Sequence, residues 1–160
     1  MPLRVMILNG PNLNLLGTRE PHIYGTVTLA AIEASCRQFA EAIGASIAFH
    51  QSNYEGALIE WVHAARNEAD AIVINPAGFS FTSMALLDAL KTFTGPIVEL
   101  HISNIHAREP MYHRSLISGV AKAVICGLGA YGYIVALQSV ARMLDALPQS
   151  LPEPLRVGPK

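Results

Sequence analysis

The side chains best suited to catalysis stand where three apolar runs of this sequence end. Asn9-Gly-Pro-Asn12 follows the first run, Asn75 closes the second and His101 closes the third. Binding sites in parallel sheets form outside the carboxyl ends of the strands, so these amide and imidazole groups would share one rim. A single asparagine at a strand end is more often a turn former than a catalytic group. Three such ends together favour a site.

Glu99 precedes His101 by two residues, and side chains two apart on a strand point to the same face of the sheet. A carboxylate beside an imidazole orients the ring and stabilises its protonated form, which suits a general acid. The spacing fits a structural ion pair on a buried face equally well. The position of His101 at the rim favours the catalytic interpretation.

A glycine-flanked loop from Leu13 to Gly25 carries Arg19 and Tyr24. Ionising a tyrosine at neutral pH costs about 4 kcal/mol, so a tyrosine that acts as a base needs a nearby cation. Arg19 and Arg108 are the candidates for that cation. Loops of this kind also close over substrates. A surface loop with an incidental arginine and tyrosine remains the alternative.

Patterns that would indicate a metal or nucleotide are incomplete. His101 and His106 are five residues apart without a carboxylate or cysteine cluster in register, which is weak evidence for a metal. Gly127-Leu-Gly129 lacks the full dinucleotide fingerprint and predicts a tight turn. Cys36 and Cys126 stand in apolar segments, and we expect buried thiols in a reducing compartment. No metal site is predicted.

The elements that position these groups alternate between short apolar runs and longer amphipathic stretches. Strands are predicted at Val5–Leu8, Ala45–Gln51, Ala71–Asn75, Ile97–His101 and Ala121–Cys126. Helices are predicted from Thr28 to about Ile43, from Glu55 to about Asn67, from Ser83 to near Thr92, and from Tyr131 to Leu147. This alternation predicts an α/β fold, a single flavodoxin-like domain whose doubly wound five-stranded parallel sheet is covered on both faces.

Composition limits the classes of function. A chain of 160 residues predicts one domain, here 1–147, followed by a proline-rich tail over 148–160 that we expect to be extended or mobile. Apolar residues make up 51% and charged residues 14%, which favours an oligomer. The net charge of −1 without a Lys/Arg run argues against nucleic acid. No signal peptide and no run of roughly 18 apolar residues occurs, so we expect no membrane partner and a cytoplasmic location.

A series of motifs resembles the type II 3-dehydroquinate dehydratases and follows that family's order over roughly residues 3 to 147. The motifs are Asn9-Gly-Pro-Asn-Leu-Asn-Leu-Leu-Gly-Thr-Arg-Glu-Pro21, Ile23-Tyr-Gly25, Gln51-Ser-Asn-Tyr-Glu-Gly56, Asn75-Pro-Ala-Gly78, Glu99-Leu-His-Ile-Ser-Asn-Ile-His-Ala-Arg-Glu109 and Gly127-Leu-Gly-Ala-Tyr-Gly132. The resemblance implies a flavodoxin-like subunit, a dodecamer built from trimers, and no metal or organic cofactor. No lysine lies in these motifs, so a Schiff base has no obvious nucleophile.

The resemblance implies elimination of water from 3-dehydroquinate, through an enolate, to give 3-dehydroshikimate. Tyr24, activated by Arg19 with Arg108 as the candidate second cation, would remove the C2 proton. Asn12 would act through a water on the enolate oxygen. Asp88 would reach the site of a neighbouring subunit.

The same resemblance assigns the leaving-group end of the reaction. His101, held by Glu99 and aided by Asn75, would protonate the departing hydroxyl. The substrate carboxylate would rest on backbone N–H groups of Ile102 and Ser103 and on the Ser103 hydroxyl.

Two positions depart from the family's motifs. Phe81 stands where the family has a histidine that binds ring hydroxyls, and Tyr112 stands where an arginine assists, with Arg114 two residues further on. Two lost polar contacts at about 1–3 kcal/mol each would weaken dehydroquinate binding by roughly two to four orders of magnitude.

Three interpretations therefore stay open. The first is a 3-dehydroquinate dehydratase whose substrate hydroxyls are held by Tyr112, Arg114 or the partner's Asp88. The second is a lyase that acts on a related β-hydroxy ketone carboxylate with a less polar distal end. The third is a binding module without catalysis, which the retention of the whole proton-transfer set disfavours. Biosynthetic and catabolic roles are not separated, since both use this reaction.

Overall fold

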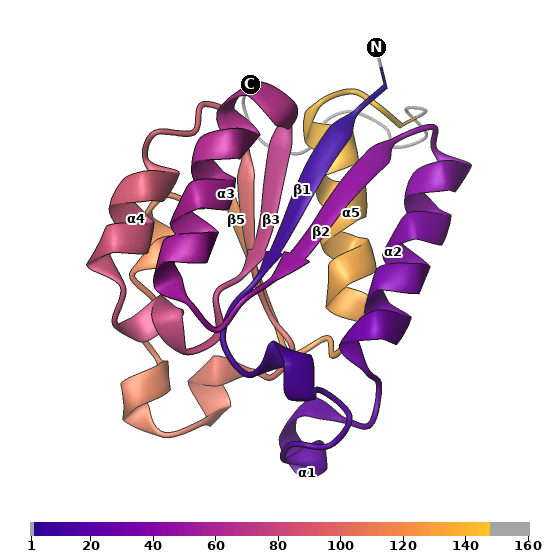
Figure 1. The fold of residues 1–160 in the computed structure, drawn as a ribbon. Helices are drawn as coiled ribbons and strands as arrows, with labels where there is room; N and C mark the ends of the chain where they lie inside the picture. The colour runs from indigo at the N-terminus through magenta and orange to yellow at the C-terminus, as the bar shows by residue number, and fades with distance from the viewer. Residues whose placement is uncertain (1, 148–160) are drawn as a thin grey trace, which may run out of the picture.

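A five-stranded sheet forms the centre of the computed structural model, which describes residues 2–147 (Figure 1). Its strands are β1 (Arg4–Asn9), β2 (Ser46–Gln51), β3 (Ala71–Asn75), β4 (Ile97–His101) and β5 (Ala123–Cys126). All neighbouring strands are parallel, in the order β2-β1-β3-β4-β5. The predicted flavodoxin-like α/β fold is thereby confirmed, while the predicted tail at 148–160 lies outside the described residues.

Two helices cover each face of the sheet (Figure 1). The helices α2 (Leu29–Ala42) and α5 (Tyr131–Met143) pack on one face, and α3 (Glu55–Glu68) and α4 (Met84–Leu90) pack on the other. Because both faces are covered, β3 and β4 are buried along their whole length and read as almost continuous apolar runs. No helix among residues 2–147 has the length and apolar character needed to cross a membrane.

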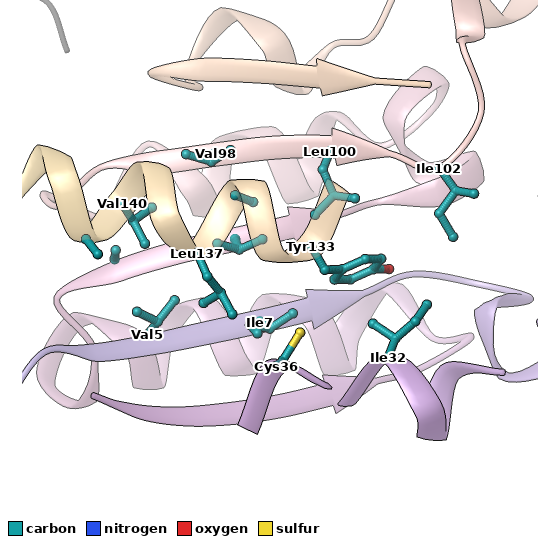
Figure 2. Packing of buried hydrophobic residues seen from close by; sticks show 14 of the residues in the cluster. Val5, Ile7, Ile32, Cys36, Val98, Leu100, Ile102, Tyr133, Leu137 and Val140 are labelled. Carbon is teal, nitrogen blue, oxygen red and sulfur yellow. The ribbon is translucent and has the colours of Figure 1, made fainter. Parts of the chain in front are cut away.

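Alternate side chains of the central strands pack into two separate hydrophobic cores, one on each face of the sheet. On the α2/α5 face, Ile7 and Leu100 pack with Tyr133 and Leu137 of α5 (Figure 2). The strand residues that alternate with these along the chain, such as Leu8, face the α3/α4 side of the sheet. This period of two places Glu99 and His101 on the α3/α4 side, the side that Ile97 also faces.

The helices α2 and α4 begin at capping side chains, whereas the last helix ends earlier than predicted. Thr28 and Ser83, where two of the predicted helices begin, are N-caps, and each side-chain oxygen accepts a backbone N–H three residues later. The prediction that the closing helix reaches Leu147 is wrong, because α5 ends at Met143. Asp145 adopts a left-handed conformation with φ 54°, which turns the chain out of the helix.

Most of the irregular structure gathers at the carboxyl ends of the strands. There the loop after β1 forms a 3₁₀ turn at Leu13–Leu15 and the short helix α1 (Pro21–Tyr24). Further 3₁₀ turns follow β3 at Ala77–Phe81 and β4 at Ile105–Ala107, Pro110–Tyr112 and Ile117–Gly119. Polar residues of several segments therefore meet at one end of the sheet.

Gly10 marks the closest approach of the loops after β1 and β3. Its N–H donates to the Asn75 carbonyl at 2.8 Å, and a Cβ at this position would stand 2.2 Å from the Pro76 oxygen. We expect Gly10→Ala to lower the free energy of unfolding by about 3 kcal/mol, because backbone must move to admit one methyl group. Urea denaturation measures the change. The matched variant Gly56→Ala, in α3 with nothing within 4 Å of its Cβ, should gain stability; equal losses in both would contradict the prediction.

Candidate active site

A pocket opens at the carboxyl ends of β1, β3 and β4, where the sequence predicts a polar rim. Most of the predicted site residues line it: Asn12, Arg19, Tyr24, Asn75, Phe81, His101, Ile102, Ser103, Arg108 and Tyr112. Asn75 of β3 and His101 of β4 line the pocket, and the loops after β1, β3 and β4 supply the rest. The parallel register brings together groups that are up to a hundred residues apart in the chain.

One end of the pocket holds a histidine on a buried carboxylate. The Nε2 atom of His101 lies 2.6 Å from Oε2 of Glu99. Glu99 is fully buried and His101 is 5% exposed, so solvent does not touch the carboxylate, and the His101 ring lies between it and the pocket. Because Nε2 faces Glu99, Nδ1 is the nitrogen left for a ligand. This arrangement can hold a proton beside the pocket and deliver it.

The other end holds a tyrosine with a cation on its hydroxyl. Nη1 of Arg108 donates a hydrogen bond of 3.1 Å to the Tyr24 oxygen. Arg19 lies elsewhere: its guanidinium carbon is 5.2 Å from the centroid of the Tyr24 ring, and its Nη2 is 3.0 Å from Oε2 of Glu20. Arg108 therefore acts on the oxygen atom, while Arg19 contributes positive charge over the ring face.

Phe81 and Tyr112 form an aromatic wall between these two ends. Their rings meet edge to face with centroids 5.4 Å apart. Phe81 also stacks beside the His101 ring, with the two ring centroids 6.4 Å apart. The guanidinium carbon of Arg108 lies over the Tyr112 ring, 4.0 Å from its centroid. The two side chains that depart from the family's motifs thus pack against His101 and against the arginine that bonds the Tyr24 hydroxyl.

The amide of Asn75 is oriented by a buried hydrogen-bond chain. Its Nδ2 donates to the Tyr133 hydroxyl at 3.1 Å, and that hydroxyl donates to Oδ1 of Asn9 at 2.7 Å. Tyr133 reaches from α5 toward the carboxyl ends of the strands (Figure 2). Burial raises the pKa of Tyr133 far above its ordinary value, so the neutral phenol serves as both donor and acceptor. Sequence reasoning missed this residue, because an apolar helix face gives no sign of one buried hydroxyl.

Removing that hydroxyl should destabilise the fold. We expect Tyr133→Phe to lower the free energy of unfolding by about 1–3 kcal/mol, because the amides of Asn75 and Asn9 each lose a buried partner. Chemical denaturation followed by circular dichroism measures the loss. Tyr131→Phe, two residues earlier and 62% exposed, is the matched control and should leave stability unchanged. A Tyr133→Phe protein as stable as the control would contradict the role of the hydrogen-bond chain.

Asn12 is held in place by the loop after β2. The residue takes a left-handed conformation with φ 69°, and its backbone N–H donates to Oδ1 of Asn53 at 2.9 Å. The same Asn53 oxygen accepts a hydrogen bond from Nε2 of Gln51. These contacts explain how the motif that begins at Gln51 takes part in the site although it does not line the pocket.

Asp88 and Arg114 lie outside the pocket of their own chain. Asp88 is exposed on α4 and pairs with Lys91 at 3.4 Å. Arg114 is exposed on the segment after Tyr112. Neither side chain reaches the site within one chain.

The residues that the structure describes contain no cluster of three or more metal-binding side chains. Cys36 of α2 is buried in the core on the α2/α5 face, and burial raises the pKa of its thiol to about 12. Cys126 is partly buried, and the pKa of its thiol is raised by burial and by the charge of Glu99. Both thiols are therefore poor nucleophiles at neutral pH.

Comparison with known proteins identifies the family. The family described as "Dehydroquinase class II" matches residues 3–141. The chain belongs to this family. It is 56% identical over 137 residues to "Catabolic 3-dehydroquinase 1" of Aspergillus fumigatus, which covers 86% of the chain and 91% of that protein. It is 51% identical over 145 residues to the "3-dehydroquinate dehydratase" of Rhizobium meliloti, covering 91% of the chain and 98% of that protein.

Solved structures of class II dehydroquinases share the fold. The type II dehydroquinase from Propionibacterium acnes matches with a TM-score of 0.85 and 40% identity, covering 88% of this chain and 97% of that one. A type II dehydroquinase from Butyrivibrio crossotus matches with the same TM-score of 0.85 at 35% identity. The resemblance deduced from the motifs is thereby confirmed.

Proposed function

We propose that this class II dehydroquinase removes water from 3-dehydroquinate to give 3-dehydroshikimate. The observation that carries the proposal is a pocket with a cation-bound tyrosine at one end and a carboxylate-bound histidine at the other. A pair of this kind provides a base to take a proton from carbon and an acid to give one to a leaving hydroxyl.

Tyr24 is the base of the proposed reaction. Its phenolate takes the proton from C2 of the substrate and leaves an enolate. The hydrogen bond from Arg108 and the positive charge of Arg19 over the ring stabilise the phenolate, since both guanidinium groups attract its negative charge. Asn12, at the pocket edge, acts through a water molecule on the enolate oxygen.

His101 is the acid that completes the elimination. The protonated ring, stabilised by Glu99, gives its proton to the departing hydroxyl as the enolate collapses to the enone, and water leaves. Asn75, fixed by Tyr133, supports this end of the pocket. After product release, the proton on Tyr24 returns to His101 through solvent.

The substrate carboxylate is placed at the turn after β4. Ile102 and Ser103 line the pocket there, and their backbone N–H groups and the Ser103 hydroxyl would bind the anion. Arg108 and Arg19, which also line the pocket, add a positive field that attracts a carboxylate substrate.

A related substrate with a less polar distal end is the second candidate, because the aromatic wall of Phe81 and Tyr112 lines the pocket. The relatives reported above are named dehydroquinases or dehydroquinate dehydratases, which favours dehydroquinate. We therefore retain dehydroquinate as the substrate and assign the wall an effect on its affinity.

The assembly and location belong to the same proposal. We propose a homododecamer, a tetramer of trimers, in which the exposed Asp88 reaches a neighbouring subunit's pocket. The reaction requires no metal or organic cofactor, and we place the enzyme in the cytoplasm with a small-molecule substrate as its partner. Light scattering on the purified protein measures the number of subunits, and a stable monomer would contradict the assembly.

One assay of steady-state turnover tests the function. Purified protein is mixed with millimolar 3-dehydroquinate, and the absorbance of the conjugated enone product is followed with time. We expect steady turnover without added metal or cofactor. Folded protein that produces no enone at millimolar substrate would contradict the proposal and leave the second candidate substrate or a binding role.

A further inference from the structure

The carboxylate of Glu99 has two hydroxyl partners besides His101. Ser115 Oγ donates to Oε1 at 3.1 Å, and Ser118 Oγ lies 3.0 Å from Oε1 and 3.1 Å from Oε2. Glu99 is fully buried, and no lysine or arginine among residues 2–147 forms a salt bridge with it. A buried carboxylate without donors is costly, so these two hydroxyls and the ring share the task of stabilising it.

Contacts within the protein itself hold the segment that carries the two serines. Ile117, which lies between them, is fully buried in the α3/α4-face core. Its N–H donates to Ser115 Oγ at 3.2 Å, and the neighbouring Leu116 N–H donates to the Ser80 carbonyl at 2.7 Å. The segment is thus fastened to the core and to the turn after β3.

The direction of each hydrogen bond follows from these contacts. Because Ser115 Oγ accepts the Ile117 N–H, its own proton is free to point at Glu99. Ser118 has one proton, which is shared between the two carboxylate oxygens. Both serines therefore stabilise the negative charge on Glu99, and a carboxylate held as an acceptor in turn binds the Nε2 proton of His101.

We propose that Ser115 and Ser118 are positioning residues that hold the Glu99 carboxylate as the acceptor of the His101 Nε2 proton and thereby fix the tautomer and orientation of the ring for the elimination. This inference rests on the proposed function for its catalytic consequence, while its physical content concerns only the state of the His101 ring. Neither serine lines the pocket, so each acts through Glu99 and does not touch the substrate.

Other titratable groups face the pair but are the same in every variant considered. Cys126 of β5 is in register with His101, and its thiol stays neutral because burial raises its pKa. Across the pocket stand Tyr24, Arg19 and Arg108. A change seen on removing the serine hydroxyls therefore reports the Glu99 environment.

Nuclear magnetic resonance of the full chain labelled with ¹⁵N-histidine tests the inference without any substrate. The His101 signals are identified by their absence from the His101→Gln protein. In Ser115→Ala/Ser118→Ala we expect the neutral ring to become a mixture of tautomers, because a Glu99 carboxylate that has lost two hydroxyl donors is held less firmly as the acceptor of the Nε2 proton.

Ser139→Ala is the matched control, since it removes a hydroxyl that is bonded to the Val135 carbonyl within α5, remote from Glu99. It should leave the His101 tautomer unchanged. A double variant whose His101 ring shows the single tautomer of the parent would overturn the inference. Should the double variant fail to fold, the single variants carry the same test, and Ser118→Thr, which keeps a hydroxyl, is expected to show the parent tautomer.

Turnover gives the catalytic readout. We expect kcat of the double variant to fall about tenfold at neutral pH with KM nearly unchanged. If the parent does not convert dehydroquinate but the change of tautomer occurs, the proposed function fails and the positioning role stands. If turnover is normal in both proteins and the change of tautomer is absent, the positioning role fails alone.

Discussion

Replacing Tyr24 with phenylalanine is expected to lower kcat for water elimination by about 10³-fold, since a positioned base contributes roughly 10²–10⁴ to such a step. The substitution removes one oxygen atom, the one that Arg108 contacts at 3.1 Å. The ring remains, so its contact with Arg19 and the shape of the pocket are retained. KM should therefore change little, and the loss should fall on kcat.

Steady-state kinetics on purified Tyr24→Phe measure this effect, with Tyr54→Phe as the control. Tyr54 is 78% exposed and lies outside the pocket, so the same chemical change there should leave kcat within twofold or so of the parent. A Tyr24→Phe enzyme that retains a tenth or more of the parent activity would remove Tyr24 from the role of base. His101 would then be the remaining candidate for both proton transfers.

The second large effect concerns affinity. Phe81→His is expected to lower KM for dehydroquinate by about ten- to a hundredfold, because it adds a hydrogen-bonding ring to an otherwise apolar wall. The ring of Phe81 already stacks beside His101 and meets Tyr112 edge to face, so an imidazole of similar shape fits the space. The proton-transfer groups are unchanged, and kcat should stay close to the parent value.

Phe81→Leu separates polarity from space in this experiment. It removes the ring without adding a donor, so it should not lower KM. The pair is compared at a pH above neutrality, where an added imidazole carries no charge. If Phe81→His raises KM or leaves it unchanged, substrate hydroxyls do not approach the wall, and the second candidate substrate with a less polar distal end gains support.

The central elements of the fold followed closely from local sequence. The bounds of β3 and β4 match the prediction, because a strand buried on both faces is a continuous apolar run with polar residues at its end. The edge strand β5 begins at Ala123 and not at Ala121, since an edge strand is paired on one side only and its apolar pattern is weaker. The end of α5 was missed because Asp145, which gives no glycine signal, takes the left-handed conformation.

Within the pocket, the order of residues along the chain was enough to predict the polar rim, because parallel strands bring their carboxyl ends to one edge. It was enough, too, to place Glu99 beside His101, because strand side chains alternate. Both inferences depend only on local geometry, and both correspond to contacts in the structure.

Contacts between distant segments were decided by tertiary packing alone. Arg108, and not Arg19, bonds the Tyr24 hydroxyl because the turn after β4 folds back across the pocket. The Tyr133 hydroxyl reaches Asn75 from α5, and the two serines reach Glu99 because Ile117 is buried between them. The sequence by itself determined the fold, the family and the strand-end groups, whose periodicity and motifs are local. Only the tertiary structure decided which hydroxyl or guanidinium meets each of them, since that depends on how loops far apart in the chain pack on the same sheet edge.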